Sequence, residues 1–335
     1  MATASPAEIA RGSGGRPQDF LIAHAPVLSI AGFFVVICMV FAFATDAFLS
    51  QQNLLNLLRQ AAPLLIVAVA MTFVITTGGI DLSVGSNLAI VNALAAIALQ
   101  AGIPWPLVVL LMLGLGAAIG LINGWVIAWE GIPAFIVTLA TLSVFRGTAL
   151  LITQGYSVPI AADSPFVQIG RGWFFGIPLP AVIAVVIAFA GFIALTQTRF
   201  GRYVTGIGAN AEAVRRAGVH VRRITAATYV LTGLAGALAG IVIAARLGSG
   251  SSNAGVGFEL EVIAAVVLGG TSLMGGRGTI VGTTLGALTI AVIGNGLILA
   301  HISPFFTQIM TGLIILAAIW LNTRLFARAR SMRRR

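Results

Sequence analysis

Lysine is absent from the 335 residues, so all 19 basic residues behind the formal net charge of +10 are arginines. A phosphate-binding loop of the form G-x-x-x-x-G-K-[ST] needs a lysine ammonium beside the β and γ phosphates of ATP. The chain therefore has no ATP site of that kind. If ATP drives this protein, a separate subunit must bind and hydrolyse it.

Cysteine is almost absent as well, because Cys38 stands alone. One thiol excludes an intrachain disulfide and a metal cluster built from thiolates. The remaining residues show no metal-ligand spacing, no His/Asp/Ser set and no paired inward carboxylates. We therefore expect no cofactor or metal on this chain and no enzymatic activity, which argues against a membrane-embedded enzyme.

Charged residues make up only 8% of the sequence and hydrophobic residues 59%, whereas soluble domains carry roughly 25% charged residues. The apolar residues form runs of about 20, enough to cross a hydrocarbon core of about 30 Å. The runs fall at about 26–44, 61–78, 83–101, 106–128, 134–153, 179–197, 224–245, 260–275, 279–299 and 305–322. This pattern predicts an all-α integral membrane protein with about ten transmembrane helices in one domain, 26–323.

One of these runs, 260–275, is less regular than the others. It is short, begins beside Glu259 and Glu261, and ends among paired glycines. Irregular backbone is tolerated at membrane depth where protein or water covers it. This segment either spans the membrane or re-enters it from one side.

Orientation follows from the positions of the arginines, which collect on the cytoplasmic side of membrane proteins. Six arginines lie in the loop 199–223, and six more lie between residue 324 and the C-terminus. We therefore predict a cytoplasmic N-terminal tail over 1–25, a basic cytoplasmic C-terminal tail over 324–335, and outward-facing segments at 45–60, 154–178 and 246–259. The basic tail is suited to anionic lipid and gives no reason to expect nucleic acid.

Two parts of the chain also repeat a short pattern. Asn123-Gly124 is followed by Pro133, Phe135 and a span, and Asn295-Gly296 is followed by Pro304, Phe306 and the last span. Because one copy starts from each side of the membrane, the pattern predicts an inverted internal repeat. A second echo, between Gly78-Gly79 and Gly269-Gly270, has the same orientation in both copies and does not fit that repeat.

The segment 76–86 places glycines, hydroxyls and a carboxylate between two apolar spans. Gly78 and Gly79 allow the backbone to leave helical geometry, and Asp81 or Ser83 can cap the helix that follows. In one interpretation Asp81 is only a helix cap at the cytoplasmic interface. In the other, the broken backbone lines a pathway or gate for a polar solute.

The loop 199–223 contains the pattern of a short, well-capped helix. Asn210 is placed as its N-cap, Glu212 lies in the first turn, Arg215 and Arg216 lie in the last, and Gly218 ends it. The segment is either a solvated basic loop or a contact for a soluble partner.

Three segments together, 78–85 (GGIDLSVG), 208–219 (G-x-N-x-x-A-x-R-x-x-G-V) and 267–278 (VLGGTSL-x-GG-x-G), resemble the permease subunits of bacterial ABC sugar importers of the ribose, xylose and galactoside type. The resemblance implies a type II importer fold in the bacterial inner membrane. It implies a cytoplasmic ATPase that binds ATP and Mg, an external solute-binding protein, and a second copy or a paralogous permease.

The resemblance also assigns roles to residues. Those expected to couple to the ATPase are Gly208, Asn210, Ala213, Arg215 and Gly218. The broken, glycine-rich backbone, apart from the resemblance, gives the residues expected in the translocation pathway or gate, which are Gly78, Gly79, Asp81, Ser83, Gly269, Gly270, Thr271 and Ser272. Related permeases for branched-chain amino acids or nucleosides lack the Ile-Asp-Leu-Ser form, so this form favours a sugar.

An ion-coupled secondary transporter of a small polar solute is the alternative. It would need paired carboxylates in the membrane interior, and of the acidic residues only Asp81 comes close to that position. A purely structural subunit would not need the broken, glycine-rich segments. Arg146, inside a span, needs an anionic or carbonyl partner or a wet cavity.

Overall fold

The computed structural model describes residues 17–303, 306, 309–310, 312–313 and 316. The first sixteen residues, most of the predicted last span and the predicted basic tail lie outside the described residues. The helices of more than ten residues are α2 (Pro17–Ala44), α3 (Gln51–Thr76), α4 (Val84–Gln100), α5 (Trp105–Trp129), α6 (Ala134–Thr153), α8 (Leu179–Gln197), α9 (Arg199–Arg216), α10 (Val221–Leu247), α11 (Phe258–Leu268) and α12 (Ile280–Leu299).

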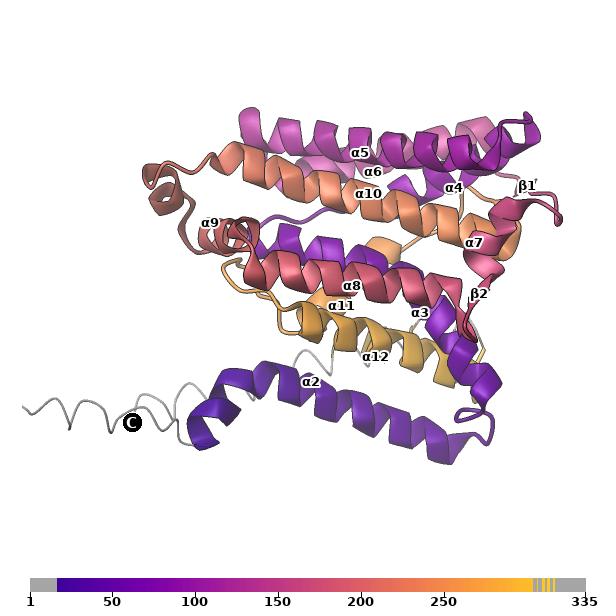
Figure 1. Ribbon diagram of the computed structural model, residues 1–335, viewed down its shortest axis with the longest axis horizontal. Coiled ribbons are helices and arrows are strands. Elements are labelled where there is room, and N and C mark those ends of the chain that lie inside the picture. The colour runs from indigo at the N-terminus through magenta and orange to yellow at the C-terminus, as the bar shows by residue number, and fades with distance from the viewer. Residues whose placement is uncertain (1–16, 304–305, 307–308, 311, 314–315, 317–335) are drawn as a thin grey trace, which may run out of the picture.

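Short elements complete the described chain. They are β1 (Val158–Pro159), η2 (Pro165–Val167), α7 (Gln168–Arg171), β2 (Trp173–Phe174), β3 (Ile177–Pro178) and β4 (Ser249–Gly250). Strand β1 pairs with β4 and β2 pairs with β3, both antiparallel. These two small ribbons hold the connections together at one end of the helices (Figure 1).

The long helices lie side by side, so the connecting segments gather at two opposite ends of the bundle (Figure 1). We call the end that holds 77–83, 198–220 and 269–279 the α9 end. We call the end that holds 154–178 and 248–257 the α7 end. Hydrogen bonds between distant segments, such as Gly276 N–H to the Thr76 carbonyl at one end and Ile160 N–H to the Gly248 carbonyl at the other, fix this grouping.

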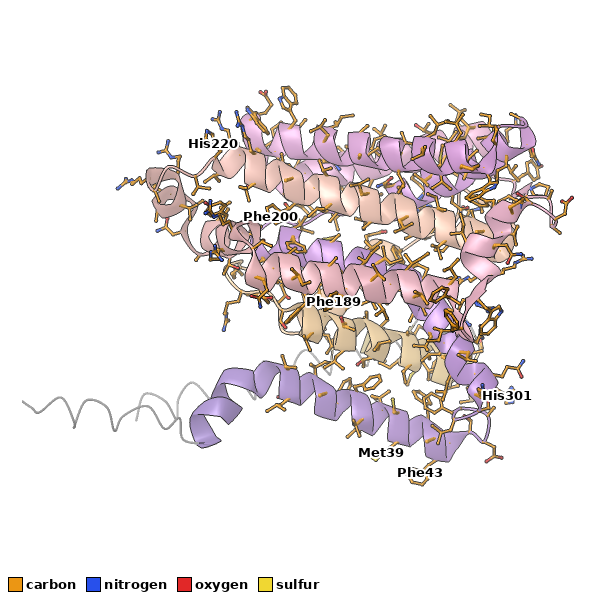
Figure 2. The ribbon with its side chains drawn as sticks, in the orientation of Figure 1. Met39, Phe43, Phe189, Phe200, His220 and His301 are labelled. Atoms are coloured by element: carbon orange, nitrogen blue, oxygen red, sulfur yellow. The ribbon has the colours of Figure 1, made fainter. Side chains whose placement is uncertain are left out.

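Among the described residues, seven helices are long and apolar enough to cross a membrane. This result confirms the prediction of an all-α membrane protein. Large apolar side chains cover the outer surface of the bundle, and Figure 2 shows Met39 and Phe43 pointing away from it on α2. Phe43 is 90% exposed, and contact with hydrocarbon instead of water would make this exposure favourable.

Helix α3 begins earlier than the apolar run 61–78 predicts. It starts at Gln51, where the Ser50 side chain caps it by accepting from Asn53 N–H at 3.3 Å. The added turns carry amides and Arg59, so hydropathy alone does not reveal them. The predicted outward segment 45–60 is therefore largely the first part of α3.

The irregular run 260–275 overlaps the short helix α11, which begins two residues earlier at Phe258. At 1.5 Å per residue its 11 residues extend about 16 Å, about half of a hydrocarbon core. The chain nevertheless passes from β4 at the α7 end to Gly276 at the α9 end, with turns on both sides of α11. Over this stretch the backbone crosses the bundle as a broken segment.

Helices α5 and α10 pack closely against each other through small residues. Gly116, Gly120 and Gly124 on α5 face α10, and a Cβ at any of them would meet α10 backbone atoms at Gly233, Tyr229 or Ala226. Small residues allow membrane helices to approach closely and gain dispersion energy. The core of the molecule lies around α3, α4 and α10, and these helices position the segments described next.

Candidate functional site

The segments 76–79, 208–209 and 274–276, which are distant in sequence, touch at the α9 end through their backbones. Gly276 N–H donates to the Thr76 carbonyl at 2.9 Å. Gly78, Gly275 and Gly276 all have positive φ, at 87°, 79° and 76°, which glycine adopts without strain. The glycines in these segments therefore allow two turns to lie against each other without intervening side chains.

Helix α9 contacts both turns at one residue, Gly208. A Cβ at this position would collide with the Thr76 carbonyl oxygen and with the backbone nitrogen of Gly276. No side chain can fit there unless the backbone moves. The structure thus brings the three sequence segments that carry the family resemblance into one contact.

The second half of α9 forms a short helix capped as the sequence predicts. Asn210 leaves helical geometry, with φ −165° and ψ 93°, and its side-chain oxygen accepts from Ala213 N–H at 3.0 Å. Gly218, at φ 84°, lies just beyond the end of this helix. The first half of α9, which the sequence did not predict to be helical, follows α8 after a break at Thr198, whose hydroxyl caps it by accepting from Gly201 N–H.

The capped helix carries the only ion pairs within the described part of the chain. Glu212 accepts from Arg215 at 2.8 Å and from Arg216 at 2.9 Å. These hydrogen bonds, led by the one from Arg215, hold the pKa of Glu212 below its ordinary value. All three side chains are exposed, as is Ala213, so this surface of α9 is available for a partner.

Asp81 lies in a buried polar network where α4, α5 and α10 meet. It is 1% exposed. One carboxylate oxygen accepts from the Ser83 backbone N–H at 3.0 Å and from the Ser83 hydroxyl at 2.6 Å, and the other accepts from the Thr232 hydroxyl at 2.6 Å. Asn123 donates in turn to the Ser83 hydroxyl at 2.9 Å. Asp81 therefore holds the turn before α4 against α10, and Ser83 connects the same turn to α5.

The residues from 269 to 272 have a different environment from 274–276. Gly269 packs against the backbone of Gly282 on α12. Thr271 accepts from Thr279 N–H at 3.4 Å, and Ser272 N–H donates to the Arg277 carbonyl at 3.0 Å. The contact with the 76–79 turn is made by Gly275 and Gly276, which the sequence-based assignment did not include.

Arg146 has carbonyl partners. Its guanidinium donates to the backbone carbonyls of Ser252 at 2.6 Å, Ala254 at 2.8 Å and Gly255 at 3.0 Å. The arginine therefore fixes the turn that leads into α11. This is one of the partner types that an arginine inside a span requires.

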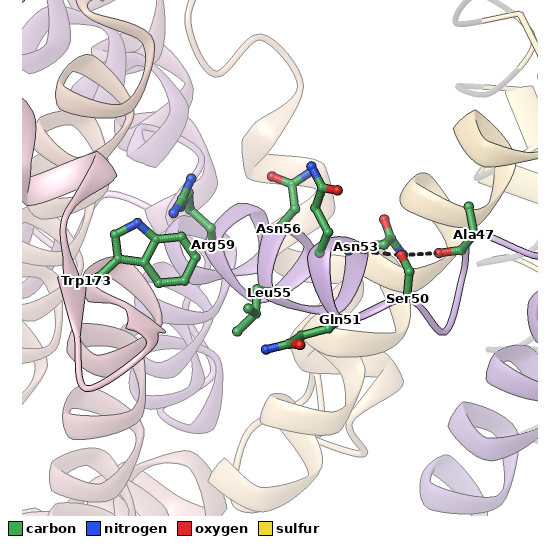
Figure 3. A pocket seen from close by; sticks show the side chains of 9 residues that line it. Ala47, Ser50, Gln51, Asn53, Leu55, Asn56, Arg59 and Trp173 are labelled. Carbon is green, nitrogen blue, oxygen red and sulfur yellow. Dashed lines mark hydrogen bonds between the residues drawn. The ribbon is translucent and has the colours of Figure 1, made fainter.

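The sequence did not predict the larger cavities at the α7 end. One, of about 790 Å³, lies between α3, α10, α11 and α12, and its polar lining residues are Gln60, Arg246, Glu261 and Asn295. The other, of about 770 Å³, lies beside the first turns of α3 (Figure 3). The sequence did indicate polar surface at this end, because the predicted outward segments contain Arg59, Arg171 and Arg246.

Arg59 forms one wall of the second cavity. Its guanidinium lies over the Trp173 ring, 4.7 Å from the ring centroid, as Figure 3 shows. Gln51, Gln52, Asn53 and Asn56 add amides to the lining. Nearby, Arg171 donates to the Arg246 carbonyl at 2.8 Å. The three arginines thus gather at the end opposite to α9.

Comparison with known proteins gives consistent results. Residues 53–319 match the family described as branched-chain amino acid transport system / permease component. The chain is 43% identical to the ribose import permease protein of Bacillus subtilis, over 88% of this chain and 91% of that protein. It is 34% identical to the xylose transport system permease protein of Escherichia coli, over 86% and 89%. No solved structure matches.

Proposed function

Because the chain belongs to the family described as branched-chain amino acid transport system / permease component, we propose that it is the membrane-spanning permease subunit of an ATP-binding-cassette importer for a monosaccharide. The relatives named for ribose and xylose import cover most of the chain. They favour a sugar over an amino acid, in agreement with the Ile80-Asp81-Leu82-Ser83 sequence.

The single observation that carries this proposal is the position of α9. Its capped half, 210–218, is exposed and bears no apolar side chain that needs lipid, whereas Gly208 touches the turns at 76–79 and 274–276. A soluble ATPase that binds the exposed half can therefore move backbone at the ends of α3 and α11. The missing P-loop lysine requires such a partner.

The arrangement of the ends also supports an orientation. The α9 end carries Arg199, Arg202, Arg215, Arg216, Arg222, Arg223 and Arg277, and the α7 end carries Arg59, Arg171 and Arg246. The positive-inside rule makes the α9 end and both termini cytoplasmic in a bacterial inner membrane. The α7 end then faces an external solute-binding protein.

Finer features of the fold belong to the same proposal. Within the part of the chain that the structure describes, seven helices are long and apolar enough to cross a membrane. Together with α4, the broken segment around α11 and the predicted span 305–322, they give ten crossings. Helices α5 and α12 run in opposite directions (Figure 1), and Asn123 and Asn295 each bind a side chain of another segment. This pattern favours an inverted repeat. We also infer that a second permease, either another copy of this chain or a paralogous permease, completes the pathway.

Reconstitution into liposomes tests the function. The permease should concentrate D-ribose or D-xylose only when the ATPase, ATP and the solute-binding protein are all present. Liposomes with the permease alone should neither hydrolyse ATP nor accumulate sugar. Uphill uptake by the permease alone, driven by a proton or sodium gradient, would replace the importer with an ion-coupled secondary transporter.

A further inference from the structure

The cavity between α3, α10, α11 and α12 has the size and composition of a small-molecule site. Its volume is about 790 Å³, within the usual range of about 300–1,000 Å³ for ligand sites. Its walls are mainly apolar, including Leu57, Pro63 and Phe258. A few polar groups on apolar walls are typical of sites that orient a ligand.

Arg246 is one of the residues that line this cavity. Its Nη1 atom is buried and has no hydrogen-bond partner within the described part of the chain. Arg59 lies near enough for the two positive charges to repel each other, and two of its own nitrogens are also buried without a partner there. Buried donors without acceptors are costly, so Arg246 favours an occupant that brings acceptor oxygens.

Glu261 supplies an acceptor to the same cavity. It lines the wall formed by α11, and the structure has no ion pair between Glu261 and Arg246. Gln60 adds both a donor and an acceptor. Asn295 contributes less, because it exchanges two hydrogen bonds with Asn53, at 3.0 and 2.9 Å. The cavity thus keeps a separate donor and acceptor.

This pair of groups selects one chemical class. A cation would be repelled by Arg246 and Arg59. An anionic group that only accepts hydrogen bonds could pair with the arginines but would leave the Glu261 acceptor without a donor. A lipid chain would leave every polar group unpaired. Each hydroxyl of a neutral polyol both donates and accepts, so a polyol can satisfy both sides of the cavity.

We propose that this cavity is a subsite for a neutral polyhydroxylated solute of monosaccharide size, with Arg246 and Gln60 donating to its hydroxyl oxygens and Glu261 accepting from a hydroxyl. The proposal rests on the proposed import function and adds the place where the permease itself contacts the solute. Three polar contacts on apolar walls give weak binding, which a transported solute requires in order to leave.

Protection from chemical labelling tests the subsite. Val256 lines the cavity and is 71% exposed, so Val256→Cys in a Cys38→Ser background places one thiol at its edge. The full permease, bound to its ATPase in lipid nanodiscs, would be labelled with a maleimide in the presence of D-ribose, D-ribonate or D-glucosamine. D-ribose should slow the labelling at millimolar concentrations, and the two charged sugars should not.

Two variants and a matched control identify the groups responsible. Arg246→Gln and Glu261→Gln should each raise the concentration of D-ribose that halves labelling by about tenfold, the effect of losing one charged hydrogen bond. Arg246→Lys, which keeps the charge, should raise it less. Glu259→Gln is the control, because Glu259 lies on the same helix but packs beside Gly85 instead of lining the cavity.

The outcomes separate this proposal from the import function. Equal protection in all variants, protection by D-ribonate, or protection that depends on lipid instead of sugar would overturn the subsite. Absence of any protection would also overturn it, even where the complete importer still takes up D-ribose. Failure of the complete importer to take up sugar would instead overturn the proposed function. Thermal unfolding of each variant shows whether it is folded.

Discussion

The two ends of the helix bundle are held together by different kinds of contact. At the α9 end, backbone touches backbone at Thr76, Gly208 and Gly276, with no side chain between them. At the α7 end, long side chains such as Arg59 and Arg246 surround cavities and keep unpaired donors. Direct backbone contacts, as at the α9 end, are suited to transmitting movement between helices. Polar side chains that can exchange hydrogen-bond partners, as at the α7 end, are suited to the transient binding of a solute.

The largest expected effect concerns the placement of the two ends on opposite sides of the membrane. Single cysteines at Gln168 and Ala209, both exposed, would be introduced in a Cys38→Ser background. An impermeant maleimide added to intact cells should label the first and spare the second. Labelling of both from the same side would contradict the assigned orientation and the ten crossings.

The second prediction tests the exposed half of α9. Ala213→Glu or Gly218→Asp places a charge on the surface proposed to bind the ATPase, and an unpaired charge in an interface costs several kcal/mol. We expect the ATPase to stop copurifying while the permease still inserts. Arg222→Ala, just outside the capped helix, is the control and should change little. The reverse pattern would indicate a purely electrostatic contact.

A smaller but specific effect is expected at the backbone contact itself. Gly208→Ala forces the α9 backbone away from Thr76 and Gly276, and overpacking of this kind typically costs about 1–3 kcal/mol. ATPase binding should persist, because residues 210–218 are unchanged, but sugar uptake per ATP hydrolysed should fall by about tenfold.

The control for this uncoupling is Gly206→Ala on the same helix. A Cβ at Gly206 meets only a Val214 methyl group, at 3.0 Å, which can rotate away. Uptake per ATP should therefore stay near that of the native protein. If Gly208→Ala behaves in the same way, the rigid contact does not transmit movement.

Asp81→Asn should affect stability more than transport. The substitution keeps the size of the side chain but leaves one donor, from Ser83 or Thr232, without its carboxylate acceptor. We expect the free energy of unfolding to fall by about 1–3 kcal/mol, measured as a lower midpoint of thermal unfolding. The exposed Asp163→Asn serves as the control. Loss of transport at unchanged stability would favour the pathway interpretation of Asp81.

The smallest effect is expected for the ion pairs of Glu212. The hydrogen bonds to Glu212 lower its pKa. Their contribution to the stability of the capped helix is therefore fully present above the ordinary pKa of a glutamate. That contribution is lost only as the pH falls through the lowered pKa of Glu212. ATPase binding should therefore not change between pH 7 and pH 5 through this residue. Glu212→Gln should weaken binding by no more than about twofold, since exposed pairs contribute little. A larger loss would make Glu212 an interface residue.

The sequence correctly predicted those helices and caps that depend on residues close together in the chain. The apolar runs located most of the crossings, because the membrane demands length and apolarity from each helix separately. The Asn210 cap was also predicted correctly, since the capping oxygen and the N–H that it binds lie three residues apart. These features need no knowledge of how distant segments pack.

Features that depend on distant contacts were missed or left open. The first turns of α3 are polar, so hydropathy placed its start too late. Gly275 and Gly276 matter because Thr76 and Gly208 lie against them, which spacing along the chain does not indicate. Arg246 and Glu261 share a cavity only because α10 and α11 are neighbours in the fold, and the roles of Asp81 remain predictions to be tested.

The hydrogen bond from Gly276 to Thr76 also has a consequence for biosynthesis. Its two residues lie far apart in the chain, and α9 is synthesised between them. Until residue 276 has left the ribosome, α9 has only one of the two turns that it rests against. A permease interrupted before that point therefore displays the ATPase-binding helix without the backing that transmits its movement. Synthesis of the chain through residue 276 thus completes the contact by which α9 would transmit its movement.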